Sequence, residues 1–476
     1  MTAVDRQHDR VLSTLNADGT RRWLRPKPSR GRFWRRRRAL AWFLIALFAL
    51  LPHLKINGRP AVLLDVARRE FSLFGGVFYP TDTVLLALFV VGVFLTIFLL
   101  TALFGRVWCG WGCPQTVYME FVFRPIERFF DGEPGRARKR GAWRTPAKYA
   151  VFLLVSMFLA HVFLAYFVGI DELARWVRRS PAEHPASFLI MASVTALMMF
   201  DFCFFREQTC IVACPYGRFQ SVLLDRRSLI VAYDPKRGEP RGRAKRGATS
   251  VPLPVVGVNG TGAPRTAGDC VDCFKCVATC PTGIDIRDGL QMECIHCAQC
   301  IDACDDVMER LARPRGLIRY GSQAGVEGER VRRLRPRVLI YPVLLAAVVT
   351  GIVVALSRIE AADVTVLRGP GLPFNVLPTG EVSNQAVVRV RNRTGAEVGY
   401  EVSVPDVDGA RVIGVESPLR VAAGALRSEA VSIVLPGGAA TQRRTEITVR
   451  ITGTDGFTAE TPFRFFGTGR AAGGTP

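Results

Sequence analysis

Four apolar blocks, each about as long as the hydrocarbon core of a membrane is thick, constrain this chain more than any other feature. The blocks cover residues 84–104, 149–169, 187–205 and 338–356. His161 and Asp201 are the only acidic, basic or histidine side chains within them. A transmembrane helix needs about 20 consecutive apolar residues. Each block therefore predicts a membrane-spanning helix.

A shorter apolar segment, residues 39–56, precedes these four blocks and follows the basic run from Arg35 to Arg38. No small-x-small cleavage site follows it, which favours a signal anchor over a cleaved signal peptide. A buried helix of a globular domain is the alternative. We expect a fifth span here.

Basic residues gather in three regions: the N-terminal tail, residues 136–148 and residues 218–337. By the positive-inside rule these regions face the cytoplasm. Five spans then place everything after Leu356 in the periplasm of a bacterial inner membrane. This topology explains the net charge of +22. Because no DNA-binding motif is present, we expect membrane lipid and no nucleic acid as a partner.

All 13 cysteines precede Asp305, and eight of them form two runs with the spacing C-x2-C-x2-C-x3-C. In two-cluster bacterial ferredoxins the fourth cysteine of each run ligates the other cluster. This pattern assigns one 4Fe-4S cluster to Cys270, Cys273, Cys276 and Cys304. It assigns the other to Cys280, Cys294, Cys297 and Cys300. Two structural zincs are the alternative, although zinc sites favour C-x2-C pairs separated by longer loops.

Two features near these runs are weaker functional candidates. His296 lies between two predicted ligands, where it either tunes a cluster through a hydrogen bond to sulfur or simply faces solvent, and we favour the second interpretation. The glycine-rich stretch 257–268 is interrupted by Pro264 and lacks a following helix pattern. It therefore does not qualify as a dinucleotide-binding loop.

Two C-x3-C-P motifs follow the spans at 84–104 and 187–205, and they indicate a duplicated helical hairpin. The cysteines concerned are Cys109, Cys113, Cys210 and Cys214. If each motif continued its helix, the spacing of four would put both sulfurs on one face. Thiolates suit Cu(I), and a thiol pair can also cycle between dithiol and disulfide. These four cysteines are therefore candidates for a soft-metal site or a redox-active thiol pair, with apolar packing as the alternative.

Four weaker candidates lie within the predicted spans. Cys203 follows Met199 by four residues, so the two could offer further soft ligands for copper, although packing is the simpler interpretation. Asp201 and His161 are ionisable groups at membrane depth, which makes them candidates for a proton or metal role.

Beyond Leu356, short β-rich runs alternate with Gly, Pro, Asp and Asn. They predict an immunoglobulin-like sandwich without a disulfide, suited to docking a periplasmic partner. The fold class is thus a multi-domain membrane protein with an α-helical transmembrane bundle of about five helices, a cytoplasmic two-cluster ferredoxin-like (α+β) insert and a C-terminal all-β sandwich. The expected parts are a tail (1–38), a four-helix region (39–217), a basic linker (218–268), the ferredoxin-like domain (269–320), a second linker (321–337), the last span (338–356) and the β domain (357–476).

The combination of these motifs closely resembles the cytochrome c oxidase accessory protein family of the CcoG, FixG and RdxA type. The strings that carry the resemblance begin at Leu54, Cys280, Cys304 and Pro314. The resemblance implies a role in assembling cbb3-type oxidase, with reduction of Cu(II) to Cu(I) on the cytoplasmic side. With that activity, the catalytic, copper-binding residues are expected to be Cys109, Cys113, Cys210 and Cys214. It also implies oxidase assembly factors, a copper transporter or chaperone and an unidentified electron donor as partners.

Two other functions remain open. One is a quinol or ferredoxin dehydrogenase-type relay of electrons to a periplasmic reductase. The other is a non-catalytic assembly scaffold whose clusters sense redox state. The sequence leaves the oligomeric state open, including a homodimer.

Overall fold

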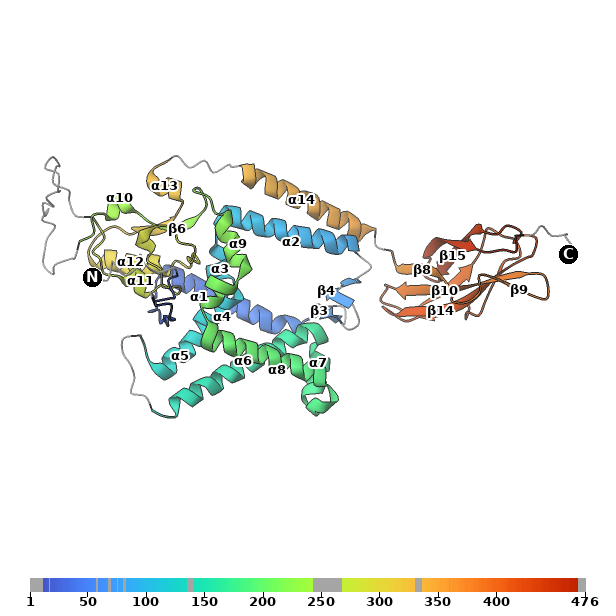
Figure 1. Ribbon diagram of the computed structural model, residues 1–476, viewed down its shortest axis with the longest axis horizontal. Coiled ribbons are helices and arrows are strands. Elements are labelled where there is room, and N and C mark those ends of the chain that lie inside the picture. Colours follow the sequence, from blue (N-terminus) through green and yellow to red (C-terminus); the bar gives the residue numbers. More distant parts are fainter. Residues whose placement is uncertain are drawn as a thin grey trace. The chain divides into compact units, whose positions relative to one another are not determined.

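The computed structural model describes residues 12–16, 18–56, 59–66, 70–74, 76–79, 83–134, 141–242, 268–329, 336–358 and 360–469. The chain divides into two compact units, Met1–Ile352 and Val353–Pro476. The first unit contains the long helices and the cysteines, and the second is built of strands (Figure 1).

Within the described residues, four helices are long and apolar enough to cross a membrane. They are α2 (Thr83–Phe104), α6 (Arg144–Val168), α8 (Pro185–Phe200, continued by a π-helical turn over Asp201–Phe205) and α14 (Pro336–Ser357). These helices coincide with the four predicted blocks, with bounds that differ by a few residues. The Pro-initiated starts of α8 and α14 follow from the fixed backbone angle of proline, which suits the first helical turn.

The fifth predicted span differs from these four. Helix α1 covers Arg32–Leu50 and therefore takes in the basic run Arg35 to Arg38, which the prediction left outside. A 3-10 turn over Leu51–His53 ends it. The apolar part, residues 39–50, is about 18 Å long, shorter than the roughly 30 Å of a hydrocarbon core. Length and composition therefore do not mark α1 as a span.

The direction of α1 nevertheless matches that of a further pass through the bundle. Its first turn contacts the cysteine-bearing segment through Asp302, and near its other end Phe48 stacks on Tyr166 in the last turns of α6, with ring centroids 5.4 Å apart. Helices α2 and α14 run antiparallel side by side (Figure 1), with the rings of Phe98 and Tyr341 5.9 Å apart. One side of the first unit therefore holds the ends nearest the cysteines of α1, α2, α6, α8 and α14. We call it the cysteine side.

A carboxylate from a distant helix caps α1. The first backbone N–H groups of a helix have no partner within the helix, and here the Ncap residue, Gly31, has no side chain to offer. Asp302 of α12 (Gln299–Arg310) accepts hydrogen bonds from the N–H groups of Phe33 at 3.1 Å and Trp34 at 2.7 Å. A Cβ on Gly31 would lie 2.2 Å from the carboxyl carbon of Asp302. The glycine therefore leaves room for the cap.

The cysteine-bearing segment is closed by a two-stranded antiparallel sheet. Strand β6 (Ile230–Tyr233) pairs with β7 (Ile318–Gly321), and the short helix α10 covers Pro235–Gly238. Residues 218–268 were expected to form a linker, but this pairing makes the part around β6 an integral strand of the domain. The continuous apolar run of β6 buries Ile230, Val231 and Tyr233, which a flexible linker would not do. Residues 243–267, including most of the glycine-rich stretch, lie outside the described residues.

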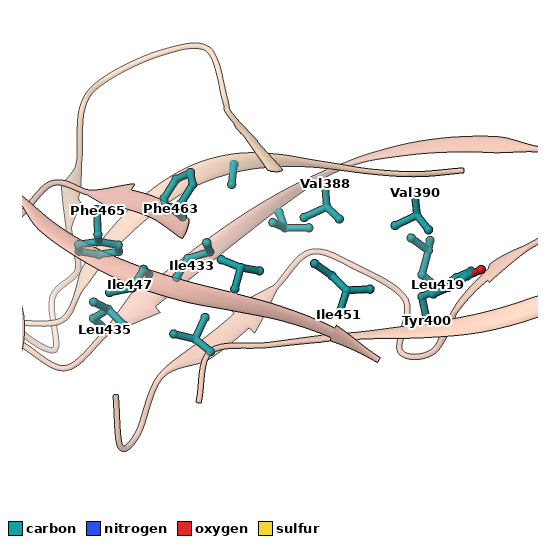
Figure 2. Packing of buried hydrophobic residues seen from close by; sticks show 14 of the residues in the cluster. Val388, Val390, Tyr400, Leu419, Ile433, Leu435, Ile447, Ile451, Phe463 and Phe465 are labelled. Atoms are coloured by element: carbon teal, nitrogen blue, oxygen red, sulfur yellow. The ribbon is translucent and has the colours of Figure 1, made fainter. Parts of the chain in front are cut away.

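The second unit is a sandwich of two antiparallel sheets. One sheet has the order β12-β14-β10-β8, with β9 also paired to β10, and the other has the order β13-β11-β15-β16. The strands are β8 (Ala362–Arg368), β9 (Asn375–Val376), β10 (Val382–Asn392), β11 (Val398–Ser403), β12 (Arg411–Ile413), β13 (Leu419–Val421), β14 (Leu426–Leu435), β15 (Thr445–Gly453) and β16 (Thr458–Phe465). Figure 2 shows side chains from both sheets meeting in its core, including Val388, Tyr400, Ile433 and Phe465, all fully buried. The sandwich prediction is confirmed.

We expect Asp302→Ala to lower the free energy of unfolding by about 1–2 kcal/mol, because two N–H groups of α1 lose their acceptor. Chemical unfolding of the detergent-solubilised protein measures this loss. Asp302→Asn is the matched control, since its amide oxygen can still accept one of the two bonds, and it should lose less. Equal stability of Asp302→Ala and the unsubstituted protein would contradict the role of the cap.

Candidate functional site

Two cavities divide the eight cysteines of the double run. One is lined by Cys270, Cys273, Cys276 and Cys304. The other is lined by Cys280, Cys294, Cys297 and Cys300, and Cys276 also reaches it. Apart from this shared residue, the structure groups the cysteines as the crossed ligand pattern does.

The backbone explains how each run wraps around its cavity. Asp272 and Phe274 flank Cys273 with positive φ angles of 51° and 55°. His296 and Ala298 flank Cys297 in the same way, with φ angles of 53° and 60°. Left-handed conformations are uncommon for residues other than glycine. Their repetition at equivalent positions turns the sulfurs of each run toward one space.

These cavities fit iron–sulfur clusters better than zinc. Among the described residues, no group of three or more His, Cys, Asp or Glu side chains is close enough to hold a single metal ion. A zinc ion would need four ligands at about 2.0–2.3 Å from one centre. In an iron–sulfur cluster each thiolate binds a different iron atom, so thiols around a wider cavity suit it. The zinc alternative therefore loses support.

The two C-x3-C-P motifs do not continue their helices. After α2, Gly105 turns the chain with a φ of +59°, and Cys109 lies in the short helix α3 (Val107–Trp111). Cys113 is extended and forms the Ncap of α4 (Pro114–Tyr118). The prediction that both sulfurs share one helical face was therefore wrong, because proline starts a new helix here instead of disturbing an old one.

The second motif repeats this geometry. Cys210 lies in a π-helical turn over Thr209–Ala213. Cys214 is extended and forms the Ncap of α9 (Pro215–Leu223), and its sulfur accepts a hydrogen bond from the N–H of Gly217 at 3.4 Å. Both motifs thus present the second cysteine at a helix N-terminus.

The four motif cysteines are electrostatic neighbours in a largely buried site. Burial raises the pKa of Cys109 and Cys113 above the ordinary value of a thiol, and the charge of a neighbouring Cys214 thiolate would add to both shifts. Burial, together with the other three thiols, raises the pKa of Cys210 to about 12. Cys109 also donates a hydrogen bond to Oε1 of Gln220 at 3.2 Å. Without a metal, the buried thiols are therefore neutral at pH 7.

This thiol group lies directly against one of the two cavities. Cys109 packs with Ile295 and Cys297 in one apolar cluster, with Tyr216 beside it. A Cβ on Gly110 would lie 2.5 Å from the carbonyl oxygen of Ile295 and 2.8 Å from the backbone nitrogen and Cα of Cys297. The bare glycine therefore lets the loop that carries Cys297 rest on α3.

A third element, α1, supports this contact through Arg37. Its side chain is 1% exposed, and its Nε donates a hydrogen bond to the carbonyl oxygen of Gly110 at 2.8 Å. Burial raises the pKa of Cys297 to about 11, and the positive charge of Arg37 opposes that shift. The sequence analysis missed Arg37, because a basic residue before an apolar block is interpreted as a signal for membrane topology.

His296 does not face solvent, contrary to the favoured interpretation. It is 1% exposed, and its Nδ1 accepts a hydrogen bond from the backbone N–H of Arg106 at 3.1 Å. Burial lowers the pKa of His296 to about 3. The neutral ring therefore joins the second cysteine run to the end of α2.

The weaker candidates make local contacts. Met199 and Cys203 pack in an apolar cluster around Phe123 and Phe202. Asp201 accepts hydrogen bonds from Nε2 of Gln115 at 3.1 Å and from the hydroxyl of Thr209, so it joins the two C-x3-C-P regions. Nδ1 of His161 lies 2.8 Å from the carbonyl oxygen of Met157 in its own helix. These contacts account for all four side chains structurally.

Three family models match the chain. A 4Fe-4S dicluster domain matches residues 205–323, a 4Fe-4S binding domain matches residues 86–132, and the IG-like fold at the C-terminus of FixG matches residues 352–468. The cysteines of the double run fall in the first match and Cys109 and Cys113 in the second. Iron–sulfur clusters are therefore the resident cofactors that the comparisons support.

Several proteins are similar over most of the chain. Protein RdxA of Cereibacter sphaeroides is 34% identical over 451 residues, 87% of this chain and 91% of the relative. Protein RdxB of the same organism is 35% identical, covering 80% of this chain and 81% of the relative. Nitrogen fixation protein FixG of Rhizobium meliloti is 33% identical, covering 78% and 77%. The crystal structure of a FixG-related protein from Vibrio parahaemolyticus matches with 22% identity and a TM-score of 0.21, covering 23% of this chain and 99% of that one.

We expect Gly110→Ala to separate the Cys297 loop from α3, because the added Cβ meets only backbone atoms there. Overpacking of this kind costs about 1–3 kcal/mol, which chemical unfolding measures. Gly112→Ala is the matched control from the same motif, since its Cβ would meet the side chain of Trp108, which is partly exposed and can move. If both variants lose the same stability, the close approach at Gly110 is not special.

Proposed function

The chain belongs to the family that includes RdxA, RdxB and FixG, and we propose that it carries electrons at the membrane to Cu(II) and reduces it to Cu(I) for the assembly of a cbb3-type oxidase. The coarser part of this statement, an iron–sulfur electron-transfer protein with membrane-spanning helices, rests on the family models and the four apolar helices. The copper reaction and the oxidase are what the sequence resemblance implies.

The observation that carries the proposal is the contact between Cys109 and Cys297. When bound, the two clusters supply sites that each accept and release one electron at a time. Cys297 lines the second cavity, and Cys109 belongs to the thiol group at the membrane edge. The packing of Cys109, Ile295 and Cys297 in one cluster supports electron delivery from the cysteine-run domain to the thiols.

The chemistry of the thiol group supports copper as its substrate. Reduction of Cu(II) to Cu(I) consumes one electron, and thiolate ligands prefer the reduced ion. Cys113 and Cys214 lie at helix N-termini, and Arg106 places a positive charge beside Cys109. These positive fields favour the thiolate forms once metal displaces the protons.

The charge distribution supports a cytoplasmic position for the cysteine side. The basic run of α1 and the basic residues Arg144 and Lys148 of α6 lie at the ends of these helices on the cysteine side, as the positive-inside rule requires. With α1 as a fifth pass of an inner-membrane protein, the sandwich would lie in the periplasm. There it would dock oxidase assembly factors, while a cytoplasmic copper transporter or chaperone would receive Cu(I).

We expect the replacement of Cys109, Cys113, Cys210 and Cys214 together by serine to lower the rate of Cu(II) reduction at least about tenfold, since hydroxyl groups are poor ligands for Cu(I). The rate is followed anaerobically with a colorimetric Cu(I) chelator, using protein whose iron and sulfide contents match those of the unsubstituted form. Cys203→Ser is the control, because Cys203 packs elsewhere. An unchanged rate in the fourfold variant would remove these thiols from the reaction.

We also expect Cu(I) affinity to rise with pH between about 6 and 9. The buried thiols have pKa values above the ordinary range, so they are protonated at pH 7 and each ligating thiol must release a proton. Two displaced protons give a slope of about a hundredfold per pH unit. Competition with a Cu(I) chelator of known pH dependence measures it. A pH-independent affinity would show that the ligands are not these thiols.

The same contact fits a second function, the relay of electrons to the quinone pool or to a periplasmic reductase. The thiol group follows the ends of the apolar helices α2 and α8, which makes a lipid-soluble quinone a candidate acceptor. Rapid oxidation of the reduced protein by a quinone in the absence of copper, together with slow reduction of Cu(II), would favour this function over the first. An active oxidase assembled by cluster-free protein in abundant Cu(I) would instead favour a scaffold.

A further inference from the structure

One cysteine of the cysteine-run domain is exposed in the described structure. All thirteen cysteines lie in the described residues, and Cys273 alone among them is exposed. Cys297, which lines the other cavity, packs in one cluster with Cys109 of the membrane-edge thiols. The cavity that Cys273 lines is therefore one step farther from those thiols. An electron that leaves near Cys297 is therefore expected to enter near Cys273.

The surface around Cys273 is a hollow of about 770 Å³. Its walls come from the segment that leads into α1, from the short helix α11 (Lys275–Ala278) and from α12. Phe274, which follows Cys273, is 37% exposed at this surface. The hollow therefore brings an apolar ring and an exposed cysteine together.

Positive charge dominates this hollow. Its basic side chains are Lys27, Arg30, Arg32, Arg35, Lys275, Arg310 and Arg315. Its acidic side chains are Asp302, Asp305, Asp306 and Glu309. Basic groups thus outnumber acidic ones by seven to four.

The acidic side chains are already engaged. Asp302 caps α1, Asp305 pairs with Arg32, Asp306 pairs with Lys275 and Arg310, and Glu309 pairs with Arg315. In the described part of the chain, the exposed side chains of Lys27, Arg30 and Arg35 have no ion-pair partner. Three cations beside Cys273 are therefore free to attract a negatively charged partner.

We propose that this hollow docks the electron donor, and that the donor is a small acidic protein that carries one electron at a time. A cluster site accepts single electrons, whereas a nicotinamide delivers a hydride, which carries two. Complementary charge steers such a protein toward the exposed cysteine and raises the rate of encounter. The donor gives up one electron per encounter, and the cluster held by the Cys273 set gains it.

This inference rests on the iron–sulfur part of the proposed function and not on copper. The experiment contains no copper, so its failure would leave Cu(II) reduction standing, and failure of Cu(II) reduction would leave the docking surface standing.

The experiment uses the full-length, cluster-loaded protein in nanodiscs and an acidic plant-type 2Fe-2S ferredoxin as the probe. Biolayer interferometry measures binding of the oxidised ferredoxin, and stopped-flow absorbance measures cluster reduction by the photoreduced form. The variant is Arg30→Gln with Arg35→Gln. The matched control is Arg36→Gln with Arg38→Gln, two exposed arginines of α1 that do not line the hollow.

We expect the Arg30/Arg35 variant to lose at least about fivefold in both affinity and reduction rate at low ionic strength. The control should stay within about twofold of the unsubstituted protein. For the unsubstituted protein, binding should weaken as salt rises. Reduction by photoreduced deazariboflavin, which is small and uncharged, should be equal in all forms.

Three results would overturn the proposal. They are salt-independent or undetectable ferredoxin binding by the unsubstituted protein, equal losses in the variant and the control, and direct reduction of the clusters by NADPH as fast as by ferredoxin. If the double variant does not fold, the salt dependence of the unsubstituted protein and the single variant Lys27→Gln decide the question in the same way.

Discussion

The contact between Gly110 and the backbone of Cys297 is the constraint on which the function of the first unit depends. It sets the distance between the cysteine-run domain and the membrane-edge thiols, and it leaves no space for even one methyl group. Arg37 fixes the same glycine through its carbonyl oxygen. Because protein interiors are closely packed, a small shift at this point would move the Cys297 loop as a whole. The geometry thus depends on a residue that has no side chain.

Buried charges hold the same two parts together. Glu120 pairs with Arg124 at 2.6 Å and accepts a hydrogen bond from Gln299 of α12 at 3.1 Å. Arg124 also lies 3.7 Å from Glu207, just after α8. Burying these groups costs free energy, and their mutual pairing offsets much of that cost. Such a network contributes more to a unique arrangement than to stability, because any other docking of the domain would leave charges unpaired.

The sequence predicted the parts whose signal is local. Spans such as α2 follow from apolar length, and the grouping of the cysteines follows from spacing that the repeated left-handed residues beside Cys273 and Cys297 then explain. The sandwich follows from alternation along strands such as β10, whereas strands as short as β9 and β13 have too few residues to show a period.

The missed features are long-range ones. Nothing in the run from Arg35 to Arg38 distinguishes Arg37, which is buried, from Arg36, which is exposed. The pairing of β6 with β7 joins segments far apart in the chain, so composition described β6 as linker. In the C-x3-C-P motifs, spacing alone could not reveal that Cys113 and Cys214 start new helices. These outcomes depend on tertiary contacts that a local pattern does not contain.

The cap on α1 also affects the order in which the protein is made. Asp302 reaches the first turn of α1 across 269 residues of sequence. Synthesis proceeds from the N-terminus, so α1 leaves the ribosome, followed by α2, α6 and α8, before the cap of α1 exists. Helix α12, which carries Asp302, also carries Cys300 and Cys304 of the two cavities. The cap on α1 and the closure of both cofactor sites therefore wait for the same late segment, α12.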